Sequence, residues 1–433
     1  MSKKIILTTL VVLGAVFGMG TLSVVNAATI YVDAVNGDDV MGDGTEENPY
    51  KTIGKGISVA GSGDTVQCAP GTYTETVSIK KQVMLIGAGS DKSIIDASSL
   101  PGNPTVIWIS NAYPQPYGVS GFKITGGKAG SWFYEGNGIY CDASANPSIT
   151  NNLISGNGRC GIYCFYGYPT ITNNVITENH GGGYREGGIV CSHSSPIITN
   201  NTISENSRNG IYCYYGSPPV TNNIISENRN YGIMREVESN PSIDYNNVWG
   251  NAGGDYWHCS PGAHDISAEP QFIGGGDYHL QATSPCIDVG SNTAPALPDT
   301  DMDGEPRIIN GVVDMGADEY SKVLAISIEL NDTEFHTGET LTIDAHVTNG
   351  SEATTVEVKC WVRFPNSKLK SLLNIPKVTL RPGLDVIVPL IKGYTFKGSE
   401  PEGGYEAGGR LACPITLDYF STDIKLFTFT STP

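Results

Sequence analysis

Charged side chains are scarce in this chain. They make up 16% of its 433 residues, with 26 Lys or Arg against 44 Asp or Glu. The formal charge of −18 argues against a nucleic-acid-binding protein, whose contact surface is basic, and against adsorption to anionic lipid. Little charge combined with 53 glycines does not suit a helical bundle and favours many short strands joined by turns.

Long apolar runs are missing after the first 27 residues. These residues have a basic start at Lys3 and Lys4, an apolar stretch from Ile5 to Met19, and small residues that end at Ala27. This order is typical of a signal peptide with its cleavage site. We therefore expect residues 1–27 to be removed. We expect the mature protein to be secreted (extracellular, at the cell surface or in the periplasm) and to have no transmembrane segment.

Paired CxxC metal-binding motifs are also missing, although the chain has ten cysteines. An even number of cysteines in an oxidising compartment permits disulfides. Cys259 could pair with Cys286, and Cys360 with Cys413, because each pair stands apart from the others in the sequence. Four further cysteines belong to a repeat.

This repeat dominates the middle of the chain and has a unit of about 22 residues. Each unit begins Gly-Ile and continues through a proline to an Asn-Asn pair, and in four of five units a cysteine follows the Gly-Ile by two positions. A unit of this length with three short β runs and no helical period is one turn of a parallel β-solenoid, since a turn buries its apolar face only by stacking on its neighbours. The units begin at Gly138, Gly161, Gly188, Gly210 and Gly232.

Stacking places equivalent residues above one another at about 4.8 Å. Strand alternation then points the Ile and Cys columns inward and the Tyr between them outward, and the Asn pairs form amide ladders. We expect about eight turns over residues 64–250. The stacked cysteines are expected to be buried free thiols, because parallel Cβ vectors fit the disulfide torsion poorly. They are Cys141, Cys164, Cys191 and Cys213.

The repeat resembles that of right-handed parallel β-helix proteins of the pectate-lyase-like superfamily. The entry at Thr29–Asp33 and the tail segments Ser284–Asp288 and Asp314–Tyr320 resemble the ends of many secreted β-helix proteins. This resemblance implies a right-handed β-helix domain over residues 28–320. It does not fix the chemistry, because the superfamily contains lyases, hydrolases, epimerases and proteins without known activity.

The region after the tail has a different pattern. Residues 321–433 contain strands that alternate at period two, with turns about every ten residues. This pattern predicts an immunoglobulin-like β-sandwich, whose role would be that of a spacer, an anchor or a glycan-binding module.

Two insertions in the repeat mark the place where function would lie, because a packed solenoid has no internal cavity. They are Gly127–Asn137 and His180–Gly187, and they leave the same corner two rungs apart, about 10 Å at strand spacing. The catalytic candidates are Glu135, Arg159, Arg185 and Glu186; the substrate-binding candidates are Trp132, Tyr134 and Tyr184, with a second outer column of Tyr166, His193 and Tyr215.

These residue types suit polysaccharide chemistry. A lyase that cleaves uronates needs a base and a positive charge that stabilises the developing anion, which Arg159 and Arg185 could supply. A glycoside hydrolase needs a carboxyl pair, to which Glu135 or Glu186 could belong. Aromatic rings stack on sugars. The alternative is that the charged residues only pair within their loops and that the second aromatic column only stabilises the sheet.

Asp299, Asp301 and Asp303, followed by Gly304, have the opening of a calcium-binding loop. Asn310 stands where an EF-hand has a bidentate Glu, and Asp314 could complete the site by another route. We therefore expect Ca²⁺ as the cofactor, with an acidic turn that binds no metal as the alternative.

Together these patterns predict a secreted β-helix protein that binds an extracellular polysaccharide or cell-surface glycan. If it is an enzyme, it cleaves that polymer as a lyase or a glycoside hydrolase. The alternative function is that of a non-catalytic adhesive or structural surface protein whose solenoid presents its loops. The strong negative charge mildly favours this alternative, or a neutral glycan, over a polyanionic substrate.

Overall fold

The computed structural model describes residues 27–431, except residues 112, 237, 310, 321–323, 350–353, 382–383, 413 and 415–418. The expected signal peptide, apart from its last residue, therefore lies outside the described residues, as do Asn310 and Cys413. No helix in the described part of the chain has the length and apolar character needed to cross a membrane.

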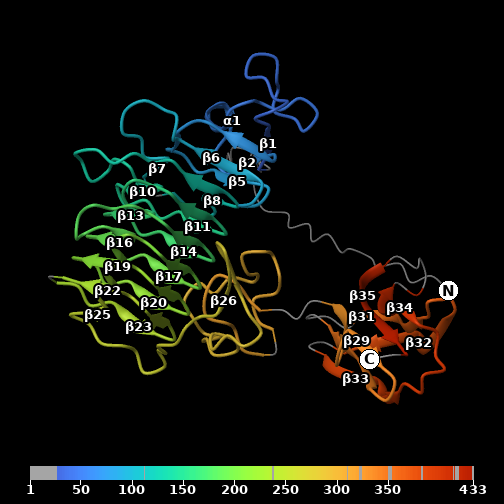
Figure 1. Ribbon diagram of the computed structural model, residues 1–433. Coiled ribbons are helices and arrows are strands. Elements are labelled where there is room, and N and C mark those ends of the chain that lie inside the picture. The colour runs from blue at the N-terminus through green and yellow to red at the C-terminus, as the bar shows by residue number, and fades with distance from the viewer. Residues whose placement is uncertain are drawn as a thin grey trace, which may run out of the picture.

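Residues 29–257 form a parallel β-helix of three sheets (Figure 1). The first sheet contains β1 (Thr29–Val32), β2 (Thr65–Cys68), β5 (Met84–Ile86), β8 (Gly118–Ser120), β11 (Ser148–Thr150), β14 (Thr170–Thr172), β17 (Ile197–Thr199), β20 (Pro219–Thr221) and β23 (Ser242–Asp244). The second contains β3 (Gly71–Tyr73), β6 (Ser93–Asp96), β9 (Lys123–Thr125), β12 (Leu153–Ser155), β15 (Val175–Thr177), β18 (Thr202–Ser204), β21 (Ile224–Ser226) and β24 (Asn247–Trp249). The third contains β4 (Val77–Ile79), β7 (Ile107–Ser110), β10 (Ile139–Asp142), β13 (Ile162–Phe165), β16 (Gly187–Ser192), β19 (Asn209–Tyr214), β22 (Tyr231–Arg235) and β25 (Gly254–Trp257).

Each turn of the helix takes one strand from each sheet, so β2 to β25 make eight turns. Neighbouring rungs pair in parallel register, for example Ile139 with Ile162 and Cys141 with Cys164. The predicted number of turns and the parallel pairing are confirmed. Helix α1 (Ile53–Val59) is capped by Thr52, whose hydroxyl accepts from the backbone N–H of Lys55 at 3.2 Å, and it buries Ile53 and Ile57 over the first turns.

The inward columns are buried as the repeat predicts. The stacked isoleucines and the four stacked cysteines have no exposed surface, and these cysteines are free thiols. Their pKa values are raised where a shift is found, and burial is the largest cause. The suggested pairing of Cys259 with Cys286 is wrong, because both are free: the thiol of Cys259 donates to a carbonyl, and the sulfur of Cys286 accepts from Asn247.

Two amide ladders run along the stack, one at each end of the second sheet. In each ladder the side-chain Nδ2 of one asparagine donates to Oδ1 of the next rung at 2.9–3.0 Å. Because these amides are buried and bonded on both sides, they fix the register of the five rungs that they span. The ladders are Asn152, Asn174, Asn201, Asn223 and Asn246, and Asn157, Asn179, Asn206, Asn228 and Asn251.

The outward tyrosine column departs from the expectation for a solvent-facing surface. Tyr140 and Tyr212 are buried, although they point away from the core. They belong to a second apolar layer outside the third sheet, in which Tyr212 packs with Val190 and Met234 and the ring of Phe133 contacts that of Tyr140. Side chains of the third sheet form most of this layer, and Phe133 of the first inserted loop packs against it.

Residues 265–320 return along the outside of the second sheet, beside the stack in Figure 1. They include the hairpin β26 (Phe272–Gly274) and β27 (Asp277–Leu280). The hydroxyls of Tyr278 and Thr177 lie 2.6 Å apart, and Nδ2 of Asn200 donates to the carbonyl of Asp314 at 2.9 Å. The tail therefore covers the outer face of β15, β18 and β21.

Residues after 323 form a separate β-sandwich. One sheet contains β28 (Ala325–Leu330), β30 (Thr340–Thr348) and β33 (Asp385–Thr395); the other contains β29 (Glu334–His336), β35 (Tyr419–Thr430), β34 (Gly403–Ala412), β31 (Thr354–Arg363) and β32 (Leu369–Leu380). Ile328 and Ile343 of one sheet and Val358 and Phe427 of the other share one hydrophobic core. The sandwich is confirmed; its immunoglobulin-like character stays a prediction.

Candidate functional site

The two inserted loops are closed by the same local device. In the first loop, Oε2 of Glu135 accepts from the backbone N–H of Trp132 at 2.9 Å. In the second, Oε2 of Glu186 accepts from the backbone N–H of Gly183 at 2.8 Å. In both loops the backbone N–H of the Glu donates back to the carbonyl three residues earlier. Both carboxylates therefore stabilise tight turns, and these contacts are structural.

Arg159 joins the two loops. Its Nη1 lies 2.6 Å from Oε1 of Glu186, and its Nη2 donates to the carbonyl of Gly130 at 2.8 Å. The side chains of Arg159 and Glu186 are only 15% and 12% exposed, so water screens this ion pair weakly. Arg159 and Glu186 therefore neutralise each other's charge.

Arg185 lies along the third sheet and takes no part in the Arg159–Glu186 pair. Its Nη2 lies 3.3 Å from Oε2 of Glu236, and its guanidinium covers the rings of Tyr184 and Tyr214 at 5.2 and 4.9 Å. The hydroxyl of Tyr212 donates to the same Glu236 oxygen at 2.8 Å. Burial and the neighbouring carboxylate raise the pKa of Tyr212, which keeps it a donor.

The four catalytic candidates thus lie at one corner, as expected, and each has an internal partner. Elimination needs a base that is free to reach the sugar proton, and hydrolysis needs two carboxyl groups that flank the scissile bond. Glu135 and Glu186 instead accept bonds from their own loops. Catalysis by these residues stays a prediction, and the arrangement favours binding.

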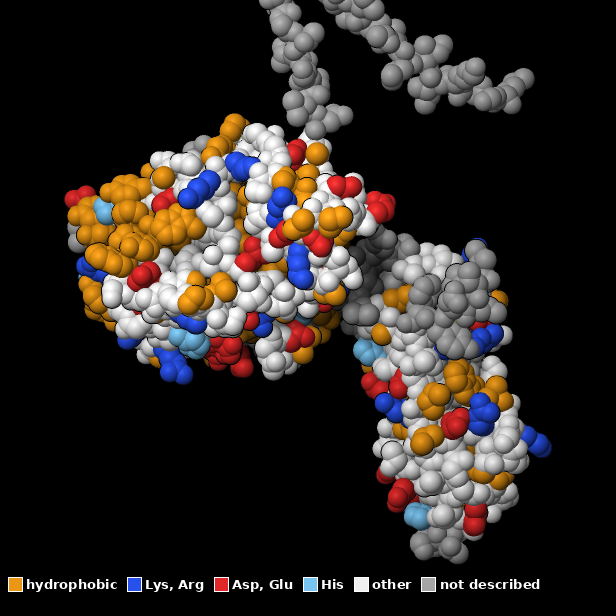
Figure 2. Space-filling model, turned by 90° about the horizontal axis from the view of Figure 1, so that it is seen from above, with side chains coloured by type: hydrophobic (Ala, Val, Ile, Leu, Met, Phe, Trp, Pro, Cys, Tyr) orange, Lys and Arg blue, Asp and Glu red, His pale blue; other side chains and the backbone are white. Residues whose placement is uncertain are grey.

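Two large aromatic side chains stand exposed on the loops. Trp132 and Tyr184 are 59% and 53% exposed. The indole of Trp132 stacks on Tyr134 with an interplanar angle of 3°, and Tyr134 packs in turn against Trp108 at 5.8 Å between ring centroids. Figure 2 shows hydrophobic side chains gathered on the left of the β-helix, the side on which Figure 1 places the third sheet.

A hollow of about 440 Å³ lies beside the first loop. Trp108 and Tyr134 form part of its wall, and Lys80 and Glu135 bring charge to it. Sequence analysis missed Lys80 and Trp108, because they come from early turns that lack the Gly-Ile-x-Cys signature. The only signal for Trp108 is its register, since it pairs with Tyr140 of the next rung.

The second aromatic column forms a continuous stack. The ring of His193 lies 4.7 Å from that of Tyr166 and 4.8 Å from that of Tyr215, at interplanar angles of 23° and 15°. All three residues have φ between 51° and 53°, so one repeated left-handed corner aligns them. The rings cover each other's faces, which suits the stabilisation of the sheet better than sugar stacking.

The three aspartates of the expected calcium loop have different surroundings. Asp301 is buried, and its carboxylate accepts backbone N–H groups from Asp303 and Glu305 at 2.9 Å and from Glu319 at 3.1 Å. Asp299 is exposed, and Asp303 turns towards His279. Asp301 therefore has the bonding of an acidic turn, and Ca²⁺ at this loop stays a prediction.

Comparison with known proteins identifies the fold. The family model described as "Right handed beta helix region" matches residues 117–264. With the three stacked parallel sheets, this match shows that the chain contains a right-handed parallel β-helix. No curated protein matches the chain.

Three solved structures are similar to parts of the chain. The CARDB domain of a Pyrococcus furiosus protein in complex with di-metal ions is 16% identical, and the alignment covers 25% of this chain and 90% of that one with a TM-score of 0.20. The sporulation control protein Spo0M from Bacillus subtilis is 15% identical over 25% of this chain and 50% of its own, with a TM-score of 0.19. XylC in complex with xylose is 12% identical over 84% of this chain and 100% of its own, with a TM-score of 0.38.

Proposed function

We propose that this protein is an exported β-helix protein that binds an extracellular polysaccharide on the outer face of its third sheet. The observation that carries the proposal is the exposure of Trp132 and Tyr184 on two loops at a corner where Arg159 and Arg185 already pair with Glu186 and Glu236. A solenoid gains nothing in its core from large exposed rings, whereas a sugar-binding surface requires them.

The loops are suited to hold these rings in place. The Arg159–Glu186 pair connects one loop to the other, and each loop is closed by its own glutamate. Rings held in this way lose little conformational entropy when a ligand stacks on them. The hollow next to Trp108 extends the surface and adds the exposed ammonium group of Lys80, which suits a hydroxyl or an isolated carboxylate of the glycan.

The charge of the chain narrows the ligand class. At −18 the protein repels a densely charged polyanion, so a neutral or sparsely charged polysaccharide fits best. The same face serves a non-catalytic adhesive protein, and the internal pairing of the arginines and glutamates favours this non-catalytic form over a lyase or a hydrolase.

The test is a panel of neutral and uronic-acid polysaccharides, measured by affinity electrophoresis and then by calorimetry on the best ligand. The double variant Trp132→Ala/Tyr184→Ala should weaken binding at least tenfold, because one stacking contact contributes about 1–3 kcal/mol. Tyr394→Ala, which removes an exposed ring from the β-sandwich, is the matched control and should bind like the parent. Equal affinity of the double variant and the parent would overturn the proposal.

The same panel distinguishes the other functions. Unsaturated uronate absorbance during incubation would identify a lyase, and new reducing ends without that absorbance would identify a hydrolase. If no polysaccharide binds with or without Ca²⁺, the alternative of a structural protein that presents its loops to another partner replaces the present one.

A further inference from the structure

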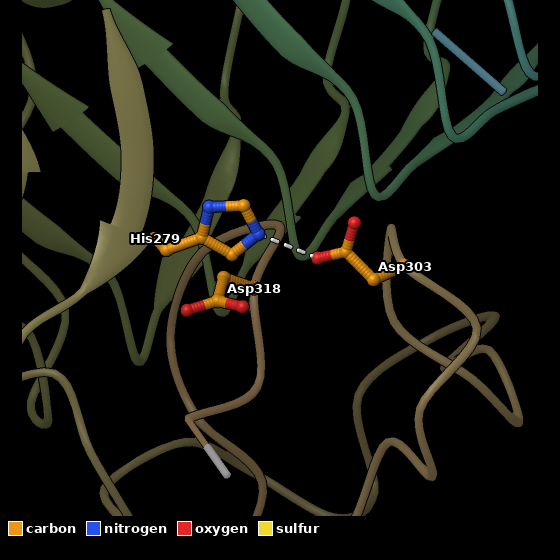
Figure 3. Close-up of side chains that lie close together, drawn as sticks. All are labelled: His279, Asp303 and Asp318. Atoms are coloured by element: carbon orange, nitrogen blue, oxygen red, sulfur yellow. Dashed lines mark hydrogen bonds and ion pairs between the residues drawn. The ribbon is translucent and has the colours of Figure 1, made fainter. Parts of the chain in front are cut away.

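His279, Asp303 and Asp318 come together at the tail of the β-helix, on a face different from the proposed glycan surface. One ligand atom from each residue lies within 4.8 Å of the others. Nε2 of His279 is 2.7 Å from Oδ2 of Asp303, and Figure 3 shows the carboxylate of Asp318 beside the same imidazole. The three residues come from different segments: β27, the turn after Asp301, and the end of the tail.

The positions of the three groups are fixed by further bonds. Asp277 contacts Nδ1 of His279 on the other side of the ring, which turns Nε2 towards the two aspartates. Oδ2 of Asp318 accepts the backbone N–H of Leu280 at 2.8 Å, and Asp318 is buried. A carboxylate behind a histidine is the arrangement that orients imidazole ligands in metal sites.

Charge and access also favour a cation. Asp277, Asp303 and Asp318 surround one imidazole, and Asp301 is bonded to the backbone of Asp303. The nearby Arg307 is buried and directs its guanidinium to four backbone carbonyls of residues 314–318, so it does not pair with these aspartates. Asp277, His279 and Asp303 line a hollow of about 500 Å³, through which an ion can enter.

We propose that His279 Nε2, Asp303 and Asp318 bind a divalent transition-metal ion of the Zn²⁺ class, with Asp277 as a positioning residue. One nitrogen and two carboxylate ligands suit such an ion, and bonds of about 2.1 Å in a tetrahedron require ligand atoms about 3.4 Å apart. The present spacings bracket that value. The site joins the β27 hairpin to the end of the tail. An ion bound there therefore links these two segments and stabilises the packing of the tail on the β-helix.

The test uses the full chain, stripped with a chelator and titrated with Zn²⁺ by calorimetry, with the melting temperature as a second readout. We expect one ion per chain and a higher melting temperature, because an ion bound only to the folded state stabilises it. His279→Gln and Asp303→Asn should weaken Zn²⁺ binding at least 100-fold, and Asp277→Asn about 10–100-fold.

Two controls make the result decisive. Asp299→Asn alters an exposed aspartate of the expected calcium loop and should leave Zn²⁺ affinity unchanged. Circular dichroism checks that each variant is folded; Asp303→Asn changes a side chain that is 48% exposed and should fold normally. The proposal is overturned if Zn²⁺ does not bind, or if it binds the folded Asp303→Asn and His279→Gln variants as tightly as the parent. A site that prefers Ca²⁺ and depends on Asp299 would establish the calcium loop in its place.

Discussion

The side-chain amide of Asn206 donates to Oδ1 of Asn228 at 3.0 Å, and the two residues are 22 positions apart, one turn of the β-helix. Oδ1 of Asn206 accepts from Nδ2 of Asn179 at 2.9 Å on the preceding rung. The same Nδ2 of Asn206 also donates to the carbonyls of Ile176 and Ser204. One buried amide therefore connects three rungs. Its loss would remove a bond to each neighbour and would leave the backbone N–H of Asn179, which donates to Oδ1 of Asn206 at 3.2 Å, without that partner.

Replacing Asn206 with Ala should destabilise the β-helix by at least ~2 kcal/mol, since each buried polar group left without a partner costs about 1–3 kcal/mol. Urea unfolding followed by circular dichroism measures the change. Asn240→Ala removes an exposed amide at a turn and should stay within about 0.5 kcal/mol of the parent. Equal losses for both variants would show that the ladder does not stabilise the stack.

The ladder also explains why the fold could be predicted from the sequence. A solenoid repeats one local environment, so the Gly-Ile, Cys and Asn-Asn positions recur visibly at the period of the turn. The early turns that contain Lys80 and Trp108 meet the same geometry with different residues, and they show no repeat. The cluster of His279, Asp303 and Asp318 was missed for another reason: tertiary folding of the tail brings its members together, and no spacing in the sequence records that.

The inserted loops show the same limit of prediction from sequence, which is that spacing does not record tertiary contacts. Their common corner followed from their position before the Gly-Ile of each turn, and the structure places them there. The ion pair between Arg159 and Glu186 could not be predicted in the same way, because it depends on how the second loop folds back. A charged residue near an aromatic one looks the same in sequence whether it faces a substrate or a neighbouring loop.

The Arg159–Glu186 pair should therefore be measurable as a structural contact. In a double-mutant cycle with Arg159→Met and Glu186→Gln, we expect a coupling free energy of about 1–3 kcal/mol, since the pair is charge-assisted and mostly shielded from water. Thermal or urea unfolding of the four proteins measures it. The Arg363–Glu406 pair, whose side chains are 47% and 37% exposed, is the matched control and should couple by less than about 1 kcal/mol.

The stacked cysteines should be unreactive in the folded protein. Burial raises the pKa values of the thiols of Cys141, Cys164 and Cys191, so neither thiolate nor access is available to an alkylating reagent. With iodoacetamide at pH 8, Cys259 should react before them, because it is only partly buried, although burial raises its pKa to about 11. Peptide mass spectrometry before and after denaturation measures this. Peptides of the column that are cross-linked without reduction would contradict the expectation.

Glu178, Glu205 and Glu227 follow equivalent positions of β15, β18 and β21, so three carboxylates stack on successive rungs. Burial, and then the charges of Glu227 and Glu178, raise the pKa of Glu205 above its ordinary value of 4.5. Because the folded state holds this proton to higher pH than the unfolded state, the stability contributed by Glu205 is fully present below pH 4.5 and falls as pH rises through the folded pKa.

Glu227→Gln removes one like charge and should stabilise the protein at pH 7 by about 0.2–1 kcal/mol, with a smaller effect at pH 4. Urea unfolding at the two pH values measures this difference. Glu46→Gln takes one charge from an exposed loop and should give the same stability change at both pH values, so an equal pH dependence of the two variants would argue against repulsion in the column.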